Sequence, residues 1–167
     1  MEIALLFLPL LASITSGFFG NYIGDRNSEI ITSFFVSISS LLSLILFYQV
    51  VVNNYESNVI IATWINSGTL NVNWSIKIDA LSSVMLVVVT LVSSLVHIYS
   101  IGYMSHDPHK SRFMSYLSLF TFAMLTLVTS DNFLQLFFGW EGVGLCSYFL
   151  IGFWFKKDSA NAAAIKA

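Results

Sequence analysis

The chain has 167 residues, of which 56% are hydrophobic and only 10% are charged, and its mean hydropathy is +0.79. Soluble domains carry about 25% charged residues, so this composition indicates an integral membrane protein and excludes an ordinary soluble domain. The net charge of -2 comes from side chains scattered in short loops, which excludes the basic patch of a nucleic-acid-binding protein.

Five apolar runs are long enough to cross a bilayer, which takes about 20 helical residues. We predict membrane-spanning helices at about residues 3–23, 30–52, 80–103, 113–128 and 133–155. Residues 159–167 resemble the beginning of a sixth helix. We expect residues 1–167 to form a single all-α membrane domain, interrupted by one surface β-hairpin, and to be the N-terminal portion of a longer subunit.

The second span is rich in serine. Its serines are Ser33, Ser37, Ser39, Ser40 and Ser43. Serine hydroxyls in a helix bond back to the preceding turn or across to a neighbouring helix, and we predict helix–helix contact here.

The periodicity changes between the second and third spans. Apolar residues from Leu70 onward alternate with polar ones, namely Val72, Trp74, Ile76 and Ile78. Period two predicts a strand, and the run 59–65 before it is separated from it by Asn66-Ser67-Gly68. We therefore predict a β-hairpin on the membrane surface, with Trp64 and Trp74 at the bilayer interface.

The third span begins after Asp79 and carries His97 well along its length. Intramembrane ionisable groups are often functional, so His97 is a candidate proton relay; a histidine hydrogen-bonded between helices is the alternative. The loop that follows contains His106, Asp107 and His109, but two histidines around Asp-Pro supply too few spaced ligands for a metal. We predict a turn at Pro108 and no metal site.

A short polar link, residues 129–132, joins the fourth span to the fifth and requires the two helices to be antiparallel. Its last two residues, Asp131 and Asn132, are of the types that accept hydrogen bonds from the first turn of a helix. We predict that one of them caps the fifth helix.

The fifth span carries a single acidic or basic side chain, Glu141, among apolar, aromatic and glycine residues. At 1.5 Å per residue it lies roughly 12 Å from the start of the helix at Phe133, well inside the hydrocarbon core. A charge at mid-membrane costs about 2.5–3.5 kcal/mol, so we predict that a proton, an ion or a partner meets Glu141. The alternative is a buried hydrogen bond between helices.

Several side chains share the Glu141 side of this helix at spacings of three and four residues. They are Phe137, Phe138, Gly144, Leu145 and Tyr148. Gly144 leaves space beside the carboxylate. The five predicted spans contain no Lys or Arg, so a basic partner of Glu141 would have to come from a helix other than these five.

Basic residues mark one side of the membrane. Under alternating threading, Arg26, Lys110, Arg112, Lys156 and Lys157 fall on the same side. The positive-inside rule then predicts these residues in the cytoplasm, with the N-terminus and the hairpin outside.

Four stretches carry a family resemblance. They are HIYSIGYM from His97, RFMSYLSLF from Arg112, DNFLQLFFGWEGVGLCSYFLIGFWF from Asp131 and ANAAAIKA from Ala160. They resemble the N-terminal part of the proton-pumping subunit of NADH-quinone oxidoreductase (respiratory complex I) called chain 5 or subunit L. GWEGVGLCSY is a specific signature of that family and its antiporter relatives.

The resemblance implies a bundle with two inverted repeats of five helices, in which a glutamate and a lysine help to move protons when quinone is reduced elsewhere in the complex. The family's glutamate falls on Glu141, and its lysine would lie beyond Ala167. The function implied is that of a proton-translocating subunit of an NADH:quinone oxidoreductase whose redox chemistry takes place in other subunits. Glu141 is the candidate proton-transfer residue, and His97 is a second candidate.

No cysteine cluster or dinucleotide fingerprint occurs, so we expect no cofactor in this chain, with NADH, FMN, iron–sulfur clusters and quinone in other subunits. The expected partners are other membrane subunits of complex I, the lipid bilayer and protons. The expected location is the bacterial plasma (inner) membrane, or alternatively the mitochondrial inner membrane. Two other functions stay open: the large subunit of a multisubunit sodium/proton antiporter, and a structural membrane fragment without transport activity.

Overall fold

The computed structural model describes residues 1–166. The helices are α1 (Glu2–Ile23), α2 (Asp25–Asn53), α3 (Ala80–Tyr103), α4 (Lys110–Val128), α5 (Phe133–Ile151) and α6 (Asp158–Lys166), and the strands are β1 (Ser57–Ser67) and β2 (Leu70–Ile78). Helices α1 to α5 are long and apolar enough to cross a membrane. The predicted architecture of about five spans with a hairpin between the second and third is therefore confirmed.

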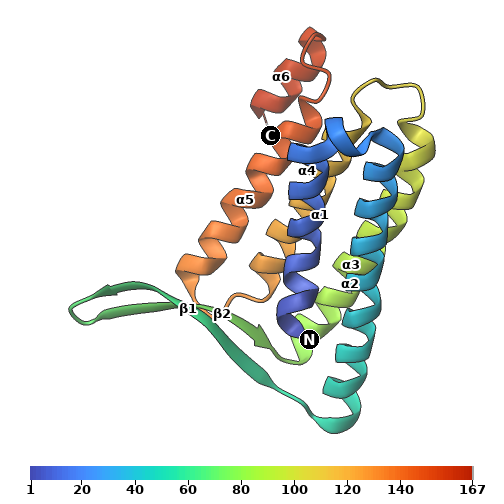
Figure 1. Cartoon of the computed structure of the whole chain (residues 1–167). Coiled ribbons are helices and arrows are strands. Elements are labelled where there is room, and N and C mark those ends of the chain that lie inside the picture. The colour runs from blue at the N-terminus through green and yellow to red at the C-terminus, as the bar shows by residue number, and fades with distance from the viewer. Residues whose placement is uncertain (167) are drawn as a thin grey trace.

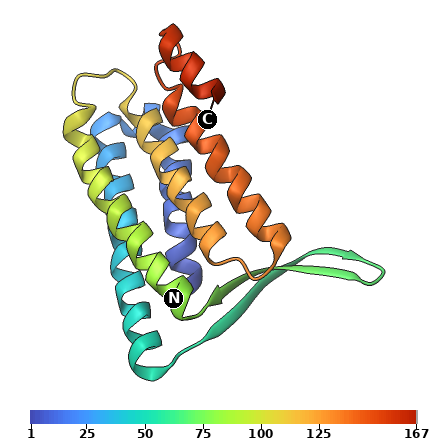
Figure 2. The ribbon, with the colours of Figure 1, turned by 180° about the vertical axis from the view of Figure 1, so that it is seen from behind.

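The helices form an up-and-down bundle with α5 at one edge (Figures 1 and 2). Helix α1 packs against α2 and α4, and α2 packs against α3. Helix α5 packs mainly against α4, and α6 follows it at the end of the bundle opposite the hairpin. One long side of α5 is therefore free of other helices among the described residues.

Three helix ends differ from the predicted spans by three residues or more. Helices α2 and α4 begin earlier than predicted, at Asp25 and Lys110. Their first turns consist mostly of polar residues that precede the apolar stretch, because a helix can extend beyond the hydrocarbon core into the polar interface. Helix α5 ends at Ile151, short of 155: the Gly152 N–H closes the helix by donating to the Tyr148 carbonyl, at 2.9 Å. Ala167, the last residue of the predicted sixth helix, lies outside the described residues.

Small polar residues hold α1 close to α4. The hydroxyls of Ser13 and Ser115 lie 3.2 Å apart, and Ser16 donates to the Ser111 carbonyl at 2.7 Å. A Cβ on Gly17 would meet the Ser115 hydroxyl at 2.7 Å. In lipid, where hydrophobicity does not drive helices together, small residues of this kind supply the packing surface.

The serine-rich face of α2 makes both kinds of hydrogen bond. Ser37 donates back to the Ser33 carbonyl at 2.7 Å, whereas the Ser43 and Thr90 hydroxyls lie 2.7 Å apart across α2 and α3. The predicted helix–helix contact is therefore present.

The hairpin begins at the end of the bundle that holds the N-terminus and extends well beyond it (Figure 1). Its strands pair antiparallel and turn at Gly68, whose φ of 59° suits glycine. The Trp64 and Trp74 rings meet edge to face across the strands, with centroids 5.2 Å apart. At its base, Ile76 and Ile78 enter the buried apolar cluster that α1 to α4 form at this end.

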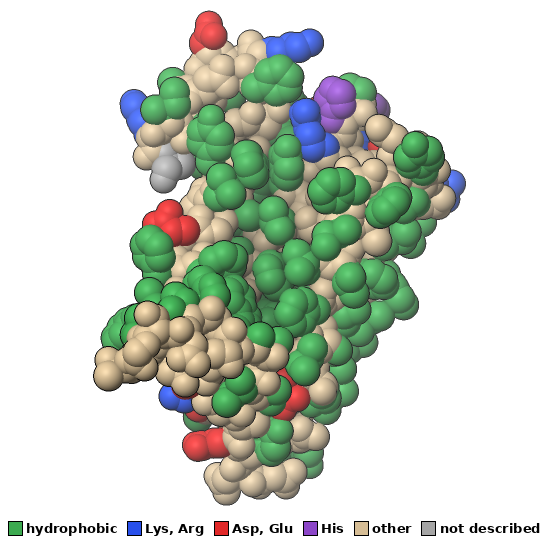
Figure 3. All heavy atoms as spheres, turned by 60° about the vertical axis from the view of Figure 1, so that its left-hand side comes forward, with side chains coloured by type: hydrophobic (Ala, Val, Ile, Leu, Met, Phe, Trp, Pro, Cys, Tyr) green, Lys and Arg blue, Asp and Glu red, His purple; other side chains and the backbone are tan. Residues whose placement is uncertain are grey.

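One face of the molecule has an apolar middle between two polar ends. Figure 3 shows hydrophobic side chains over the middle of one face, with most of the visible Lys, Arg and His side chains at the α6 end. This distribution matches a protein whose middle lies in a bilayer.

Candidate functional site

Helix α5 turns one face toward α4, and glycines bring the two helices together. The buried residues of this face are Gln135, Gly139 and Cys146. A Cβ on Gly139 would lie 2.7 Å from the Leu127 Cα, and one on Gly142 would lie 3.2 Å from the Ala123 Cβ. Any side chain at Gly139 would push the helices apart, so this contact fixes the rotation of α5 about its own axis.

The start of α5 is tied to the hairpin. Asn132 caps the helix, as one of the two predicted residues, by accepting from the Gln135 N–H at 2.9 Å. The buried Gln135 amide bonds both backbone groups of Ser75 in β2, at 3.1 Å and 2.7 Å. Asp131 instead accepts from Asn58 at 2.8 Å and pairs with Lys77 at 3.7 Å.

Glu141 lies on the opposite face of α5, away from α4. Its side chain is exposed, as are those of the four large residues that share this face. They are Phe137, Phe138, Leu145 and Tyr148. A Cβ on Gly144 would meet nothing within 4 Å, so there is open space one turn beyond the carboxylate. Among residues 1–166, no ion pair includes Glu141.

This exposed face, which we call the Glu141 face, is chemically unbalanced. It places one carboxylate among aromatic and aliphatic side chains in the middle of a helix that can cross the bilayer. Such a charge is costly against lipid and is normally met by protein, water or a proton. A carboxylate in this setting can accept, hold and release a proton.

His97 occupies the contrasting position. Its side chain is fully buried between α3 and α4, with Nδ1 2.7 Å from the Ser93 carbonyl and Nε2 3.0 Å from the Ser118 hydroxyl. A carbonyl can only accept, so Nδ1 carries a proton. In the neutral ring Nε2 then accepts from Ser118, and in the charged ring it donates to that hydroxyl.

The structure does not bring the two predicted site residues together. His97 lies in the α3–α4 interface, whereas Glu141 is on the side of α5 that points away from α4. A proton could pass between His97 and Glu141 only through other groups that lie between them.

Another carboxylate, that of Glu29, is buried, but it did not stand out in the sequence because it falls between the first two predicted spans. In the structure it lies one turn into α2, is 5% exposed, and has no hydrogen-bond partner for Oε1 among the described residues. Lys110 and Asp25 are its charged neighbours. The small residues Ser28 and Ser33 near it were the available signal that this end of the helix is buried.

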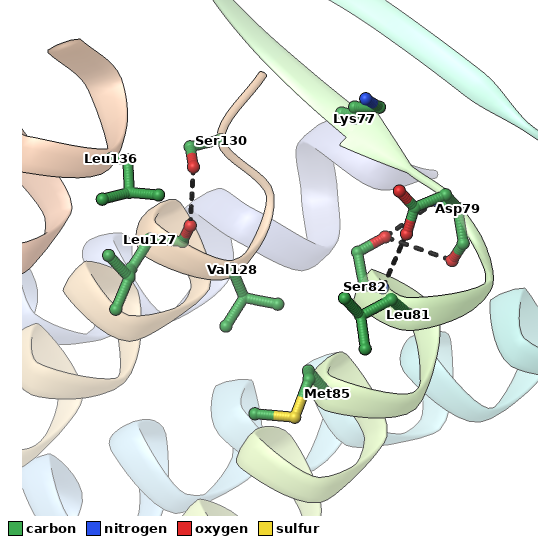
Figure 4. Close-up of a pocket in the computed structure, with 9 residues that line it drawn as sticks. All are labelled: Lys77, Asp79, Leu81, Ser82, Met85, Leu127, Val128, Ser130 and Leu136. Atoms are coloured by element: carbon green, nitrogen blue, oxygen red, sulfur yellow. Dashed lines mark hydrogen bonds between the residues drawn. The ribbon is translucent and has the colours of Figure 1, made fainter. Parts of the chain in front are cut away.

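A cavity of about 300 Å³ opens at the hairpin end, between the start of α3 and the start of α5 (Figure 4). Of its polar side chains, Asp79, Ser82 and Ser130 bond the local backbone, whereas Lys77 pairs with Asp131. Asp79 accepts from the Ser82 N–H at 2.8 Å, and the Ser82 hydroxyl accepts from the Asp79 N–H at 2.8 Å, which is a capping box at the start of α3. The Ser82 backbone N–H holds the pKa of Asp79 below its ordinary value although partial burial opposes this.

The loop between α3 and α4 forms the predicted turn. Asp107 accepts from the His109 backbone N–H at 2.8 Å and from the Trp154 indole N–H at 2.9 Å. Both carboxylate oxygens are thus used within the fold.

Two family models match the chain. The one described as "NADH-Ubiquinone oxidoreductase (complex I), chain 5 N-terminus" matches residues 64–114, and the one described as "NADH:quinone oxidoreductase/Mrp antiporter, TM" matches residues 130–167. The second match contains Glu141 and the whole of α5.

Individual relatives match over nearly the whole chain. The chain is 57% identical to NADH-ubiquinone oxidoreductase chain 5 of Phytophthora infestans over 165 residues, which is 99% of this chain and 25% of the relative. It is 57% identical to chain 5 of Arabidopsis thaliana over 167 residues, and 55% identical to NADH-quinone oxidoreductase subunit L of Rickettsia conorii over 165 residues. It spans about a quarter of the length of these relatives. The chain therefore belongs to the family of complex I chain 5 and subunit L, and it corresponds to the N-terminal quarter of its members.

Proposed function

We propose that this protein is a proton-translocating membrane subunit of NADH:quinone oxidoreductase and that Glu141 is its proton-transfer residue. The relatives' names support the assignment to complex I. The observation that carries the proton-transfer role is the placement of Glu141 on an otherwise apolar, exposed face of a membrane helix, with open space at Gly144. Redox chemistry with NADH, FMN, iron–sulfur clusters and quinone belongs to other subunits in this proposal.

His97 is a second candidate for proton transfer in the same proposal. Its ring bridges a backbone carbonyl and the Ser118 hydroxyl, and the Ser93 and Thr121 hydroxyls lie 2.7 Å apart across the same interface. An imidazole that is hydrogen-bonded to a hydroxyl is able to exchange a proton along that bond. The alternative role of His97 is a structural hydrogen bond that joins α3 to α4, because its ring is fully buried between these helices.

The test uses the assembled complex in its membrane. Glutamine keeps the size and hydrogen bonding of glutamate but cannot exchange a proton, so Glu141→Gln should lower proton pumping at least ten-fold at normal assembly. Glu141→Asp keeps an exchangeable proton and should retain more activity than Glu141→Gln. Proton pumping and quinone reduction are measured together and normalised to the amount of complex.

Glu56→Gln is the matched control, because it makes the same chemical change in an exposed loop outside the helices. It should leave pumping unchanged. Pumping by Glu141→Gln equal to that of the unmodified complex would show that Glu141 is only a hydrogen-bonding group and would refute the proposal.

A sodium/proton antiporter subunit is the second candidate function, because the family model that covers α5 is described by both names. Copurification of the protein with quinone-reducing subunits supports complex I, whereas sodium-dependent proton exchange without them supports the antiporter. The proposed location is the bacterial plasma membrane, with the mitochondrial inner membrane as the alternative. The chain is 57% identical to Arabidopsis thaliana chain 5 and 55% identical to the Rickettsia conorii subunit, so relatives of both kinds match it closely.

The proposed orientation places the basic end of the bundle in the cytoplasm, or in the matrix if the membrane is mitochondrial. A cysteine introduced near His109 should react with a membrane-impermeant reagent only from that side, and one near Ser67 only from the opposite side. Cys146 is buried and serves as the unreactive background. Labelling of the two positions from the reverse sides would overturn this orientation.

A further inference from the structure

A cavity of about 250 Å³ opens at the basic end of the bundle, between the α3–α4 loop and the segment that follows α5. We call it the basic-end cavity. Its lining residues come from these two segments and the start of α4: Asp107, Pro108, His109, Arg112, Phe153, Trp154, Phe155, Lys156 and Lys157. Its lining includes four of the Lys, Arg and His side chains that gather at this end of the bundle (Figure 3).

The guanidinium group of Arg112 is held in this wall but is not satisfied there. Its Cζ lies 4.8 Å from the centroid of the Phe153 ring and 5.7 Å from that of Phe155. Its only hydrogen bond among the described residues is a long one, 3.5 Å from Nη2 to the Phe153 carbonyl, and its Nε is buried without a partner. Aromatic faces hold a cation in place but offer no acceptor oxygen. The N–H groups of Arg112 therefore remain available to an anionic ligand.

The cavity also carries excess positive charge. Lys157 lies over the Trp154 ring at 5.3 Å, and Lys156 is exposed beside it. Among residues 1–166, no ion pair includes either lysine or Arg112. The one carboxylate, Asp107, accepts from two N–H groups of the fold and supplies a single negative charge against the three cations, so the cavity keeps a net positive charge.

The position of the cavity identifies the class of anion. It lies at the ends of α4 and α5, where a membrane-spanning bundle meets the lipid head groups, and aromatic side chains form much of its wall. Basic pockets at the cytoplasmic or matrix edge of membrane helices suit acidic lipid head groups. We propose that the basic-end cavity binds the phosphate group of an anionic phospholipid, whose acyl chains extend into the bilayer beside the helices. A free phosphate ion would match the same cations but has no acyl chains to place in the bilayer.

The test measures lipid binding to the intact protein in its assembled complex, purified in a neutral detergent. Phosphatidylglycerol is added, and bound lipid is counted by native mass spectrometry, with phosphatidylcholine and inorganic phosphate as separate additions. The double variant Lys156→Gln/Lys157→Gln should weaken phosphatidylglycerol binding about 25-fold, since each cation near a lipid surface contributes about five-fold. The matched control is Arg26→Gln/Lys166→Gln, which removes two exposed cations outside the cavity and should change binding less than two-fold.

Three results would overturn the proposal. The first is that phosphatidylcholine binds as tightly as phosphatidylglycerol. The second is that an equal concentration of inorganic phosphate displaces phosphatidylglycerol. The third is that the control variant weakens phosphatidylglycerol binding as much as Lys156→Gln/Lys157→Gln does. Arg112→Lys supplies a second measurement, because it keeps the charge but loses the planar fork of donors. It should weaken phosphatidylglycerol binding several-fold while the complex still assembles, and unchanged binding would also contradict the proposal.

Discussion

The α3–α4 interface and the Glu141 face treat an ionisable side chain in opposite ways. At the interface, His97 is fully buried and both ring nitrogens have partners, Ser93 and Ser118. On the Glu141 face, the carboxylate is exposed among apolar side chains and has no ion pair within residues 1–166. The bundle itself supplies the hydrogen-bond partners of His97, whereas a partner for Glu141 has to come from outside these helices. In this fold, therefore, the buried histidine has all its hydrogen-bond partners while the exposed glutamate has no ion pair among the described residues.

The largest effect expected concerns the contact that turns Glu141 away from α4. Gly139→Ala should destabilise the protein by about 1–3 kcal/mol, because the new Cβ would meet the Leu127 backbone at 2.7 Å and force the helices apart. Gly144→Ala makes the same change on the Glu141 face, where nothing lies within 4 Å, and should be neutral or stabilise by up to about 1 kcal/mol. Thermal unfolding in detergent measures both. Equal melting temperatures for the two variants would show that the rotation of α5 does not depend on this contact.

A smaller effect should distinguish the two faces by their hydroxyl groups. Ser118→Ala leaves Nε2 of the buried His97 without its partner and should cost about 1–2 kcal/mol of stability. Tyr148→Phe removes a hydroxyl from the exposed Glu141 face and should change stability by less than about 0.5 kcal/mol. Unfolding free energies of the two variants supply the measurement. A cost for Tyr148→Phe as large as that for Ser118→Ala would mean that the Glu141 face is packed against protein.

The smallest effect concerns Asp79, a carboxylate that its own helix satisfies, in contrast to Glu141. Its pKa is lowered, first by the Ser82 N–H, so folding favours the charged form. The resulting stability is present above the unfolded pKa of about 3.9 and is lost as the pH falls through the lower, folded pKa. Asp79→Asn keeps a capping oxygen but does not titrate, so its melting temperature should fall less steeply than that of the unmodified protein between about pH 5 and 2. The difference in the free energy of unfolding between the two proteins should be about 1 kcal/mol or less. Superimposable plots of melting temperature against pH for the two proteins would refute this prediction.

Much of the fold could be predicted because local patterns carry it. Long apolar runs indicated the spans, the alternation from Leu70 indicated the hairpin, and the polar link before Phe133 indicated the cap that Asn132 makes. These signals depend on neighbours within a few residues along the chain. The end of α5 was harder to place, because Gly152 is followed by apolar residues that continue the pattern of a span.

The candidate site was less predictable, because its decisive contacts join distant segments. The partner of His97 is 21 residues away in the sequence, and Gln135 bonds a strand residue 60 positions before it. The burial of Glu29 likewise depends on the arrangement of the helices around the start of α2. Sequence patterning did place the aromatic residues and Gly144 on the side of Glu141, but it could not show that this side faces away from the bundle.

The short link between α4 and α5 has a consequence for how the protein is made. Only four residues join the two helices, and glycine contacts hold them together, so they are suited to leave the translocon and enter the bilayer as a pair. Pairing covers the Gly139 face of α5 and leaves the Glu141 face bare. During biogenesis, therefore, the helical pair carries an uncovered carboxylate into the membrane, where protein, water or a proton has to offset its cost.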